Sequence, residues 1–257
     1  MNDEVRSMTK YIKSTFALEN MDFANGEILD IINHKKGKEQ GMIKTQTIYT
    51  SWNDYLIDGT NVLKNIPNIQ DQDNLTAFER ISSANRLAEL YEEPISNDFD
   101  INHLCQIHKY LFQDIYDWAG EIRNVHMMKQ ATVFLEPEKI RKYLEAILNE
   151  TKEDLMNIKN KYDFATVLAN LFYCLIFAHP FREGNGRTIR EFIRQLVNSM
   201  DLEFGAFDID YSKIDQNNLA MGLTCAAPMF ITNELYKALI DRKPNSKILQ
   251  YKKSMNS

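Results

Sequence analysis

HPFREGNGRTIR occupies residues 179–190, directly after the apolar run LFYCLIFA at 171–178. The run predicts a buried helix over 162–178, and Pro180 predicts that this helix ends near His179, because the residue before a proline avoids the helical conformation. Downstream, apolar residues recur at helical spacing and define one core face: Ile189, Phe192, Ile193, Leu196 and Val197. The stretch therefore predicts a helix, a short FREGNG loop and a second helix.

The loop lies where the second helix begins, and free backbone N–H groups at a helix start favour an anion. Gly184 and Gly186 permit backbone conformations in which several N–H groups converge on one anion. Arg187 and Arg190 add forked donors that suit phosphate oxygens. The pattern GxxxxGK[ST] of a Walker loop is absent. The loop therefore predicts a different kind of polyphosphate site.

Two further groups, one in the loop and one just before it, suggest chemistry beside that site. Glu183 is a candidate ligand for Mg²⁺, which commonly takes one carboxylate together with substrate phosphates. His179 can accept a proton near neutral pH. Taken singly, a histidine, an EGNG turn and an arginine stripe are most often structural. Their joint occurrence behind a buried helix favours a functional site that transfers a phosphate-containing group to a hydroxyl.

Composition limits the class of protein. The chain has 257 residues and a formal net charge of −6, which argues against a general nucleic-acid binder. Its three cysteines are far apart and form no CxxC, so they predict neither a disulfide framework nor a zinc site and favour a reducing cytoplasm. The N-terminus has no apolar signal core, and the run at 171–178 is too short to span a bilayer. We therefore expect a soluble cytoplasmic protein that binds neither membrane nor nucleic acid.

Periodicity predicts a mostly helical chain. The expected helices, besides the pair around the loop, cover 4–18, 26–34, 77–92, 100–117, 137–158, 208–222 and 228–241. Between 122 and 136, β-branched and aromatic residues on both sides of Lys129-Gln130 predict a small β-hairpin. We interpret His103 and His108 as structural and Trp118 as a packing residue.

The pattern HxFx[D/E]GNGRxxR is the signature of the Fic family, and residues 179–190 match it at every specified position. The resemblance extends to LFQDIYDWAGEIR at 111–123, TVFLEP at 132–137 and YLIDGTNVLKN at 55–65, and covers roughly 42–240. It implies an all-α helical bundle with a small β-hairpin flap. The Fic domain would cover 42–245, with a core at about 100–200, and 246–257 would be a polar tail.

The resemblance also implies transfer of AMP from ATP to a Tyr, Ser or Thr hydroxyl of a target protein, and of the enzyme itself. His179 would be the general base, Glu183 would bind Mg²⁺ or Mn²⁺, and Arg190 would hold the γ-phosphate. The α- and β-phosphates would be held by Gly184, Asn185, Gly186 and Arg187. The target backbone would dock by strand addition on the flap residues Lys129, Thr132, Val133 and Phe134.

Other readings of the family resemblance stay open. Doc-type kinases replace the second glycine with lysine, and phosphocholine transferases alter the first, so the intact GNG favours AMP transfer. Removal of AMP from a modified target, with Glu19 orienting a water, is one alternative. A catalytically silent binding module is another, although His179, Glu183 and Arg190 are all present. The sequence leaves the oligomeric state open, as it does export into a host cell.

A second motif lies near the N-terminus, in STFALEN at 14–20. Thr15 and Glu19 lie four residues apart on one helix face and Asn20 follows, which resembles the inhibitory motif [S/T]xxxE[G/N] of the family. Because 21–39 also resembles small Fic antitoxins, residues 1–41 are expected to form antitoxin-like inhibitory helices. Glu19 would face the negative end of its helix dipole, at a cost of roughly 0.3–1 kcal/mol. We expect it to pair with Arg190, and the Thr15 hydroxyl to hydrogen-bond near the phosphate site.

Overall fold

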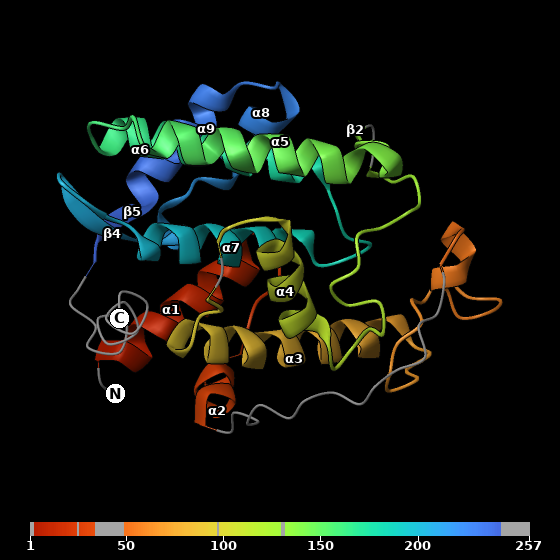
Figure 1. Ribbon diagram of the computed structural model, residues 1–257. Helices are drawn as coiled ribbons and strands as arrows, with labels where there is room; N and C mark the ends of the chain where they lie inside the picture. The colour runs from red at the N-terminus through yellow and green to blue at the C-terminus, as the bar shows by residue number, and fades with distance from the viewer. Residues whose placement is uncertain (1–2, 25, 34–48, 97, 130–131, 243–257) are drawn as a thin grey trace.

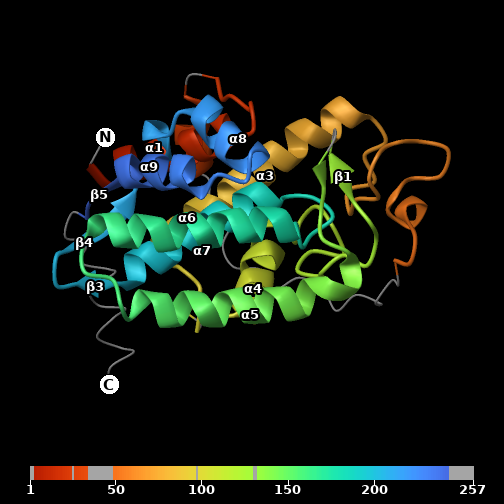
Figure 2. The same cartoon turned by 90° about the horizontal axis from the view of Figure 1, so that it is seen from above.

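The computed structural model describes residues 3–24, 26–33, 49–96, 98–129 and 132–242 (Figure 1). Two helices joined by the FREGNG loop lie at its centre: α6 (Lys161–Ala178) and α7 (Asn185–Ser199). Figure 2 shows α6 running between α9 (Pro228–Ala238) and α5 (Pro137–Leu155). Length and composition alone would allow α6 to cross a membrane, but here it is the central helix of the bundle.

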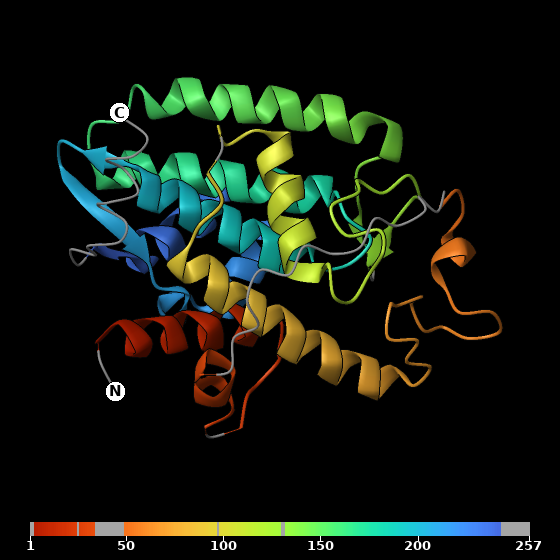
Figure 3. The same ribbon diagram turned by 60° about the horizontal axis from the view of Figure 1, so that its bottom comes forward.

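The other helices surround this pair (Figure 3). Helix α4 packs on α7, helices α1 and α3 lie together below it, α2 packs on α3, and α8 packs on α9. Their bounds are α1 (Asp3–Ala17), α2 (Glu27–Asn33), α3 (Gln72–Glu92), α4 (Ile101–Phe112) and α8 (Gln216–Thr224). Among the described residues, two single 3₁₀ turns complete the helical part: η1 (Trp52–Tyr55) and η2 (Tyr211–Lys213).

The strands described are short and antiparallel. β1 (Met128–Lys129) pairs with β2 (Thr132–Val133) to give the expected hairpin, although it is shorter than the segment 122–136. β3 (Asp201–Leu202) and β4 (Gly205–Ile209) follow α7, and β5 (Leu239–Asp241), which follows α9, completes a three-stranded sheet with them. The all-α fold class with a small β-hairpin is therefore confirmed.

The expected helix over 208–222 is wrong for its first half, and only 216–222 lie in α8. Residues Asp208 and Ile209 belong to strand β4, which is paired with β5. The segment then breaks twice at aspartates that cap new turns, because the Asp210 side chain accepts from Ser212 N–H and the Asp215 side chain from Asn218 N–H. The same pairing shortens the predicted helix 228–241, whose last three residues form β5.

Helix α1 lies inside the main core. Met8, Ile12 and Phe16 have no exposed surface and belong to the same buried cluster as the apolar faces of α6 and α7. The expected boundary at residue 41 and the expected tail at 246–257 lie outside the described residues.

Candidate functional site

The FREGNG loop is held in shape by its own asparagine. The Asn185 side chain accepts a hydrogen bond from Phe181 N–H at 2.9 Å and donates one to the Phe181 carbonyl at 2.7 Å. The side-chain amide therefore braces the loop, and the role predicted for Asn185 in phosphate binding would fall to its backbone N–H. Gly184 begins α7 with φ of 78°, and a Cβ there would lie 2.2 Å from the Phe112 ring. The chain at this position therefore requires glycine.

His108 supports the loop from α4. Its ring stacks on Phe181 with centroids 3.9 Å apart, and its Nε2 lies 3.0 Å from the Glu183 carbonyl. Gly120 N–H donates to His108 Nδ1 at 2.7 Å, so Nε2 carries the proton and donates to that carbonyl. Burial lowers the pKa of His108 to about 3, so the ring is neutral. His108 is structural, as expected, but its contact with residue 183 has no signal in the sequence.

His179 closes α6 in the left-handed conformation, with φ of 44° and its N–H bonded to the Leu175 carbonyl at 3.0 Å. Burial, with the nearby charges of Arg123 and Lys129 acting in the same direction, lowers the pKa of His179 to about 4. The imidazole is therefore neutral at pH 7 and able to accept a proton. It stacks on the ring of Phe134, with centroids 3.8 Å apart.

The predicted docking residues of the flap differ in how far their side chains are exposed. Lys129, Thr132 and Val133 are exposed in β1 and β2, where Lys129 pairs with Thr132. Phe134 is buried against His179, so its side chain contacts the candidate base, and its part in target docking stays a prediction. The strand ends at Val133, and the Leu135 N–H donates to the Phe177 carbonyl of α6.

Arg123 is a site residue that the motif did not reveal. It is buried, and its guanidinium donates to the carbonyls of His179 at 2.7 Å and Leu135 at 2.7 Å, while its own N–H donates to the Pro180 carbonyl at 2.8 Å. Burial lowers the pKa of Arg123 to about 10. Arg123 thereby joins the base of the flap to the end of α6, beside the candidate base.

The two motif arginines meet the N-terminal glutamate. Arg190 donates through a terminal nitrogen to Glu19 Oε1, so the expected pair is present. Arg187 Nε lies 3.1 Å from Glu19 Oε2. The other two nitrogens of Arg187 donate to Ser83 Oγ at 3.0 Å and to Glu79 Oε1 at 2.6 Å. These two α3 residues were not predicted, because polar residues on a helix usually indicate a solvated face.

An anion already occupies the start of α7. A Cβ on Gly186 would lie 2.5 Å from Glu19 Oε1, so the carboxylate rests against the first helical turn. Burial opposes its charge, but Arg187 and Arg190 outweigh burial and lower the pKa of Glu19. Both arginines still have a buried Nε that makes no aligned hydrogen bond within the described chain. We call the first turn of α7, together with the side chains of Arg187 and Arg190, the anion cradle. Because both Nε–H groups lack an aligned acceptor among the described residues, the anion cradle still has hydrogen-bond donors available.

Thr15 and Asn20, the other two residues of the N-terminal motif, have different structural roles. The Thr15 side chain is fully buried, and its hydroxyl has no hydrogen-bond partner among the described residues, so the expected bond near the cradle is absent. Asn20 has φ of 57° and follows the last turn of α1. Met21 N–H bonds to the Phe16 carbonyl and Asn20 N–H to the Ala17 carbonyl, which is a Schellman ending. The G/N position of the motif therefore ends the helix just after Glu19.

Glu183 fits a divalent cation. Its carboxylate is partly buried and accepts from Gly184 N–H at 2.9 Å. Burial, and then the charge of Glu79, raises the pKa of Glu183, so a cation beside it would stabilise its charged form. No group of three or more His, Cys, Asp or Glu side chains within the described ranges forms a closed metal site. One carboxylate suits Mg²⁺, which draws further ligands from water and phosphates.

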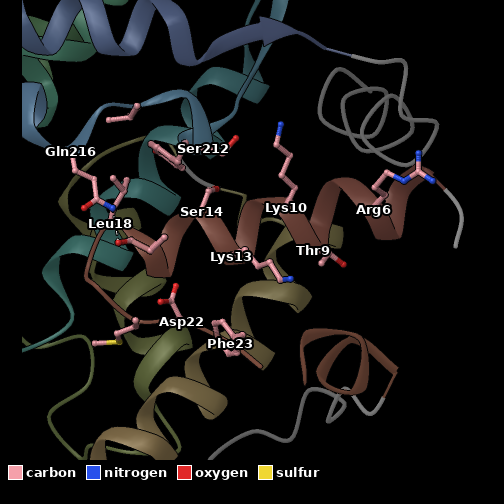
Figure 4. A pocket seen from close by; sticks show the side chains of 14 residues that line it. Arg6, Thr9, Lys10, Lys13, Ser14, Leu18, Asp22, Phe23, Ser212 and Gln216 are labelled. Carbon is pink, nitrogen blue, oxygen red and sulfur yellow. Dashed lines mark hydrogen bonds between the residues drawn. The ribbon is translucent and has the colours of Figure 1, made fainter. Parts of the chain in front are cut away.

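A separate pocket lies on the outer side of α1 (Figure 4). It has a volume of about 710 Å³ and lies between α1 and the segment from η2 to the start of α8. Arg6, Lys10 and Lys13 line it, and none of the residues 179–190 does. This pocket is therefore distinct from the anion cradle, which Glu19 fills.

Comparison with known proteins identifies the loop and its surroundings. The family model described as Fic/DOC family matches residues 98–197. The chain is 31% identical to the probable protein adenylyltransferase Fic of Escherichia coli, over 72% of this chain and 92% of that protein. It is 32% identical to the protein adenylyltransferase VbhT of Bartonella schoenbuchensis over 76% of this chain, and the match spans only 40% of VbhT.

A solved structure shares the fold. The BepC protein of Bartonella tribocorum, crystallised with bound AMPPNP, superposes with a TM-score of 0.65 at 24% identity. The superposition covers 74% of this chain and 98% of that one. At this identity the likeness establishes the fold.

Proposed function

The chain belongs to the Fic/DOC family, and we propose that it transfers AMP from ATP to a hydroxyl side chain of a target protein. The observation that carries the proposal is a neutral histidine at one end of the FREGNG loop and an anion cradle at the other. The relatives named protein adenylyltransferase support the same reaction. The whole protein's target is part of the proposal, because the match covers less than half of VbhT.

In this reaction His179 takes the proton of the target hydroxyl while the oxygen attacks the α-phosphorus of ATP. The bond from the α-phosphorus to the bridging oxygen breaks, and pyrophosphate leaves. A low pKa leaves His179 unprotonated at neutral pH, as a general base must be. Arg123 donates to the His179 carbonyl and so holds the backbone at the end of α6. General-base assistance of this kind contributes about 10²- to 10⁴-fold in rate.

The phosphates would bind in the anion cradle. The N–H groups at the start of α7 would contact the α- and β-phosphates, and Arg190 the γ-phosphate. Arg187 would donate through Nε, the nitrogen that α3 leaves free. Glu183 would hold Mg²⁺ or Mn²⁺, which neutralises phosphate charge when bound. Positioned donors of this kind stabilise the charge on the leaving pyrophosphate without having to reorganise.

The flap would position the target. Thr132 and Val133 are exposed on β2, and Lys129 on β1, so an extended segment can add beside them. Backbone pairing depends on the geometry of the added strand more than on its side chains. The flap could therefore hold an extended target segment so that its hydroxyl faces His179.

We propose further that Glu19 inhibits the reaction. Its carboxylate lies against Gly186 and pairs with Arg190, and the γ-phosphate would need the same donors. ATP would then bind only with its phosphate chain displaced from the line of attack.

Labelled ATP tests the reaction. The protein is incubated with α-labelled and, separately, γ-labelled ATP with Mg²⁺ or Mn²⁺ in a cell lysate, in the wild type and in Glu19→Gln. Label from the α position alone supports AMP transfer to protein. Label from the γ position alone would replace the proposal with kinase chemistry, and no label in either form would favour a silent binding module. Loss of label from a pre-modified target would instead support AMP removal.

A further inference from the structure

The guanidinium of Arg187 is oriented by α3 and not by its own helix. One terminal nitrogen donates to Glu79 Oε1 at 2.6 Å and the other to Ser83 Oγ at 3.0 Å. Glu79 and Ser83 lie one turn apart on α3, so both project from one face. Two of the three nitrogens are thereby used, and Nε is left facing Glu19 Oε2 at 3.1 Å.

Glu79 is itself fixed in place. Its second carboxylate oxygen accepts from the Tyr116 hydroxyl, and the Ser83 hydroxyl donates to the Glu79 carbonyl at 2.6 Å. Glu79, Ser83 and Tyr116 are all buried. Because each donor in this group has a partner, the arrangement does not depend on what occupies the anion cradle.

Arg187 has competing carboxylates nearby. The charges of Glu19 and Glu183 both act on it, in addition to that of Glu79. The guanidinium is buried among the rings of Phe112 and Phe16, where an unpaired charge is costly. Without Glu79, the guanidinium would therefore turn toward another carboxylate. A turn toward Glu183 would both remove Nε from the cradle and occupy the carboxylate suited to a cation.

We propose that Glu79 is a positioning residue for the phosphate chain: it directs Arg187 Nε–H into the anion cradle and keeps the guanidinium away from Glu183. The inference rests on the proposed function, because it takes the occupant of the cradle to be the polyphosphate of a nucleotide. Glu79 touches neither the phosphate nor the hydroxyl and acts through Arg187.

Binding by calorimetry tests this role. In the Glu19→Gln protein, which frees the cradle, the affinities for inorganic tripolyphosphate, ATP and adenosine are compared with and without Glu79→Gln. Loss of an oriented, charge-assisted donor should weaken tripolyphosphate and ATP by about tenfold. Adenosine should bind equally well, because it has no phosphate. The matched control is Glu89→Gln, which neutralises another arginine-paired carboxylate of α3, 2.9 Å from Arg86, and should change none of the three affinities.

The outcomes separate positioning from a merely structural role. Equal tripolyphosphate affinity in the Glu79→Gln and Glu89→Gln proteins would overturn the proposal, as would a parallel loss of adenosine binding. Tyr116→Phe provides a milder variant that keeps the Glu79 carboxylate, and it should give a smaller loss with the same restriction to phosphate ligands. Tripolyphosphate contains no adenosine, so it reports on Glu79 even if labelled ATP reveals no AMP transfer. Absence of its binding to the Glu19→Gln parent would overturn the cradle and this role together.

Discussion

At the residue scale, the loop depends on two left-handed backbone positions. His179 ends α6 with φ of 44°, and Gly184 begins α7 with φ of 78°. The motif predicted a glycine at position 184, and the structure gives the physical reason for it: the Phe112 ring leaves no space for a Cβ. The histidine conformation was not apparent, because a proline after it excludes helix without selecting the left-handed region.

Gly184→Ala should destabilise the protein by about 2–5 kcal/mol. The left-handed conformation contributes roughly 1–2 kcal/mol, and forcing a Cβ onto the Phe112 ring adds about 1–3 kcal/mol. Gly59→Ala is the matched control, because Gly59 has φ of 74° and no atom within 4 Å of its Cβ position. Gly59→Ala should therefore lose only the roughly 1–2 kcal/mol that comes from the left-handed conformation. Urea unfolding of both variants gives the free energies, and equal losses would contradict the packing argument.

The pH dependence of kcat/KM for AMP transfer tests His179. This quantity reports ionisation of the free enzyme, and His179 must be neutral to accept a proton. With the pKa of His179 lowered to about 4, kcat/KM should stay level from pH 8 to about pH 5 and fall only below that. A histidine with an ordinary pKa would lose activity already below about pH 6.5. Rates are measured in Glu19→Gln, with circular dichroism confirming the fold at each pH.

An acid limb near pH 6.5 would show that His179 is not held as the structure indicates. His179→Ala should abolish transfer and leave the ATP affinity within about threefold, since its contacts are with the hydroxyl and not with the phosphates.

At the element scale, the position of Glu19 follows from how α1 ends. The Schellman ending at Asn20 stops the helix one residue after Glu19 and turns the chain away. A glutamate at this end opposes the helix dipole, and the arginines of α7 compensate for it. The resemblance of residues 14–20 to the inhibitory motif, together with this misplaced charge, predicted the Glu19–Arg190 pair. It did not predict that Arg187 shares the carboxylate, because that contact depends on how α3 turns the guanidinium.

Glu19→Gln should raise AMP transfer by about tenfold to a hundredfold. It removes the charge that competes with the γ-phosphate and keeps the side-chain shape, and a hydrogen bond to a charged group contributes about 1.5–3 kcal/mol. Incorporation of label from α-labelled ATP is the measurement. Glu27→Gln is the control, since it neutralises a partly exposed carboxylate that pairs with Arg80 at 2.8 Å, away from the anion cradle.

The increase should vanish in an Arg190→Ala background, where the γ-phosphate has lost its partner. If Glu19→Gln and Glu27→Gln transfer AMP at the same rate, α1 does not inhibit.

At the scale of the whole molecule, local patterns predicted the bundle and the loop, and long-range contacts escaped prediction. The helices around 162–178 and after the loop follow from apolar periodicity. Arg187 meets Glu79 across 108 residues, and Arg123 meets His179 across 56. In the sequence, these partners look like ordinary surface residues of a helix and a turn. Only the packing of the folded chain makes them buried partners. Reasoning from a single sequence could therefore identify the motif residues of the site, but not the residues that hold them in place.

The same packing decides whether the N-terminal helix is a separable unit. On α1, Met8, Ile12 and Phe16 are fully buried in the main core. The Tyr11 hydroxyl of α1 donates to Glu191 of α7 at 2.5 Å, and Glu191 also accepts from Arg194 at 2.7 Å; all three side chains are buried. Removing α1 would expose this ion pair as well as the apolar side chains.

A chain that begins at residue 42 should therefore not fold stably. Loss of the four buried side chains Met8, Tyr11, Ile12 and Phe16, at about 1.5–3 kcal/mol each, removes roughly 6–12 kcal/mol, which is comparable to the whole stability of a typical domain. The truncated chain should be insoluble or melt without cooperativity, whereas full-length Glu19→Gln should keep a cooperative melt. Residues 1–41 co-expressed as a separate chain should restore solubility by covering the same surface. A cooperative melt of 42–257 alone, close to that of the full chain, would show that α1 is a detachable inhibitor and that the core closes without it.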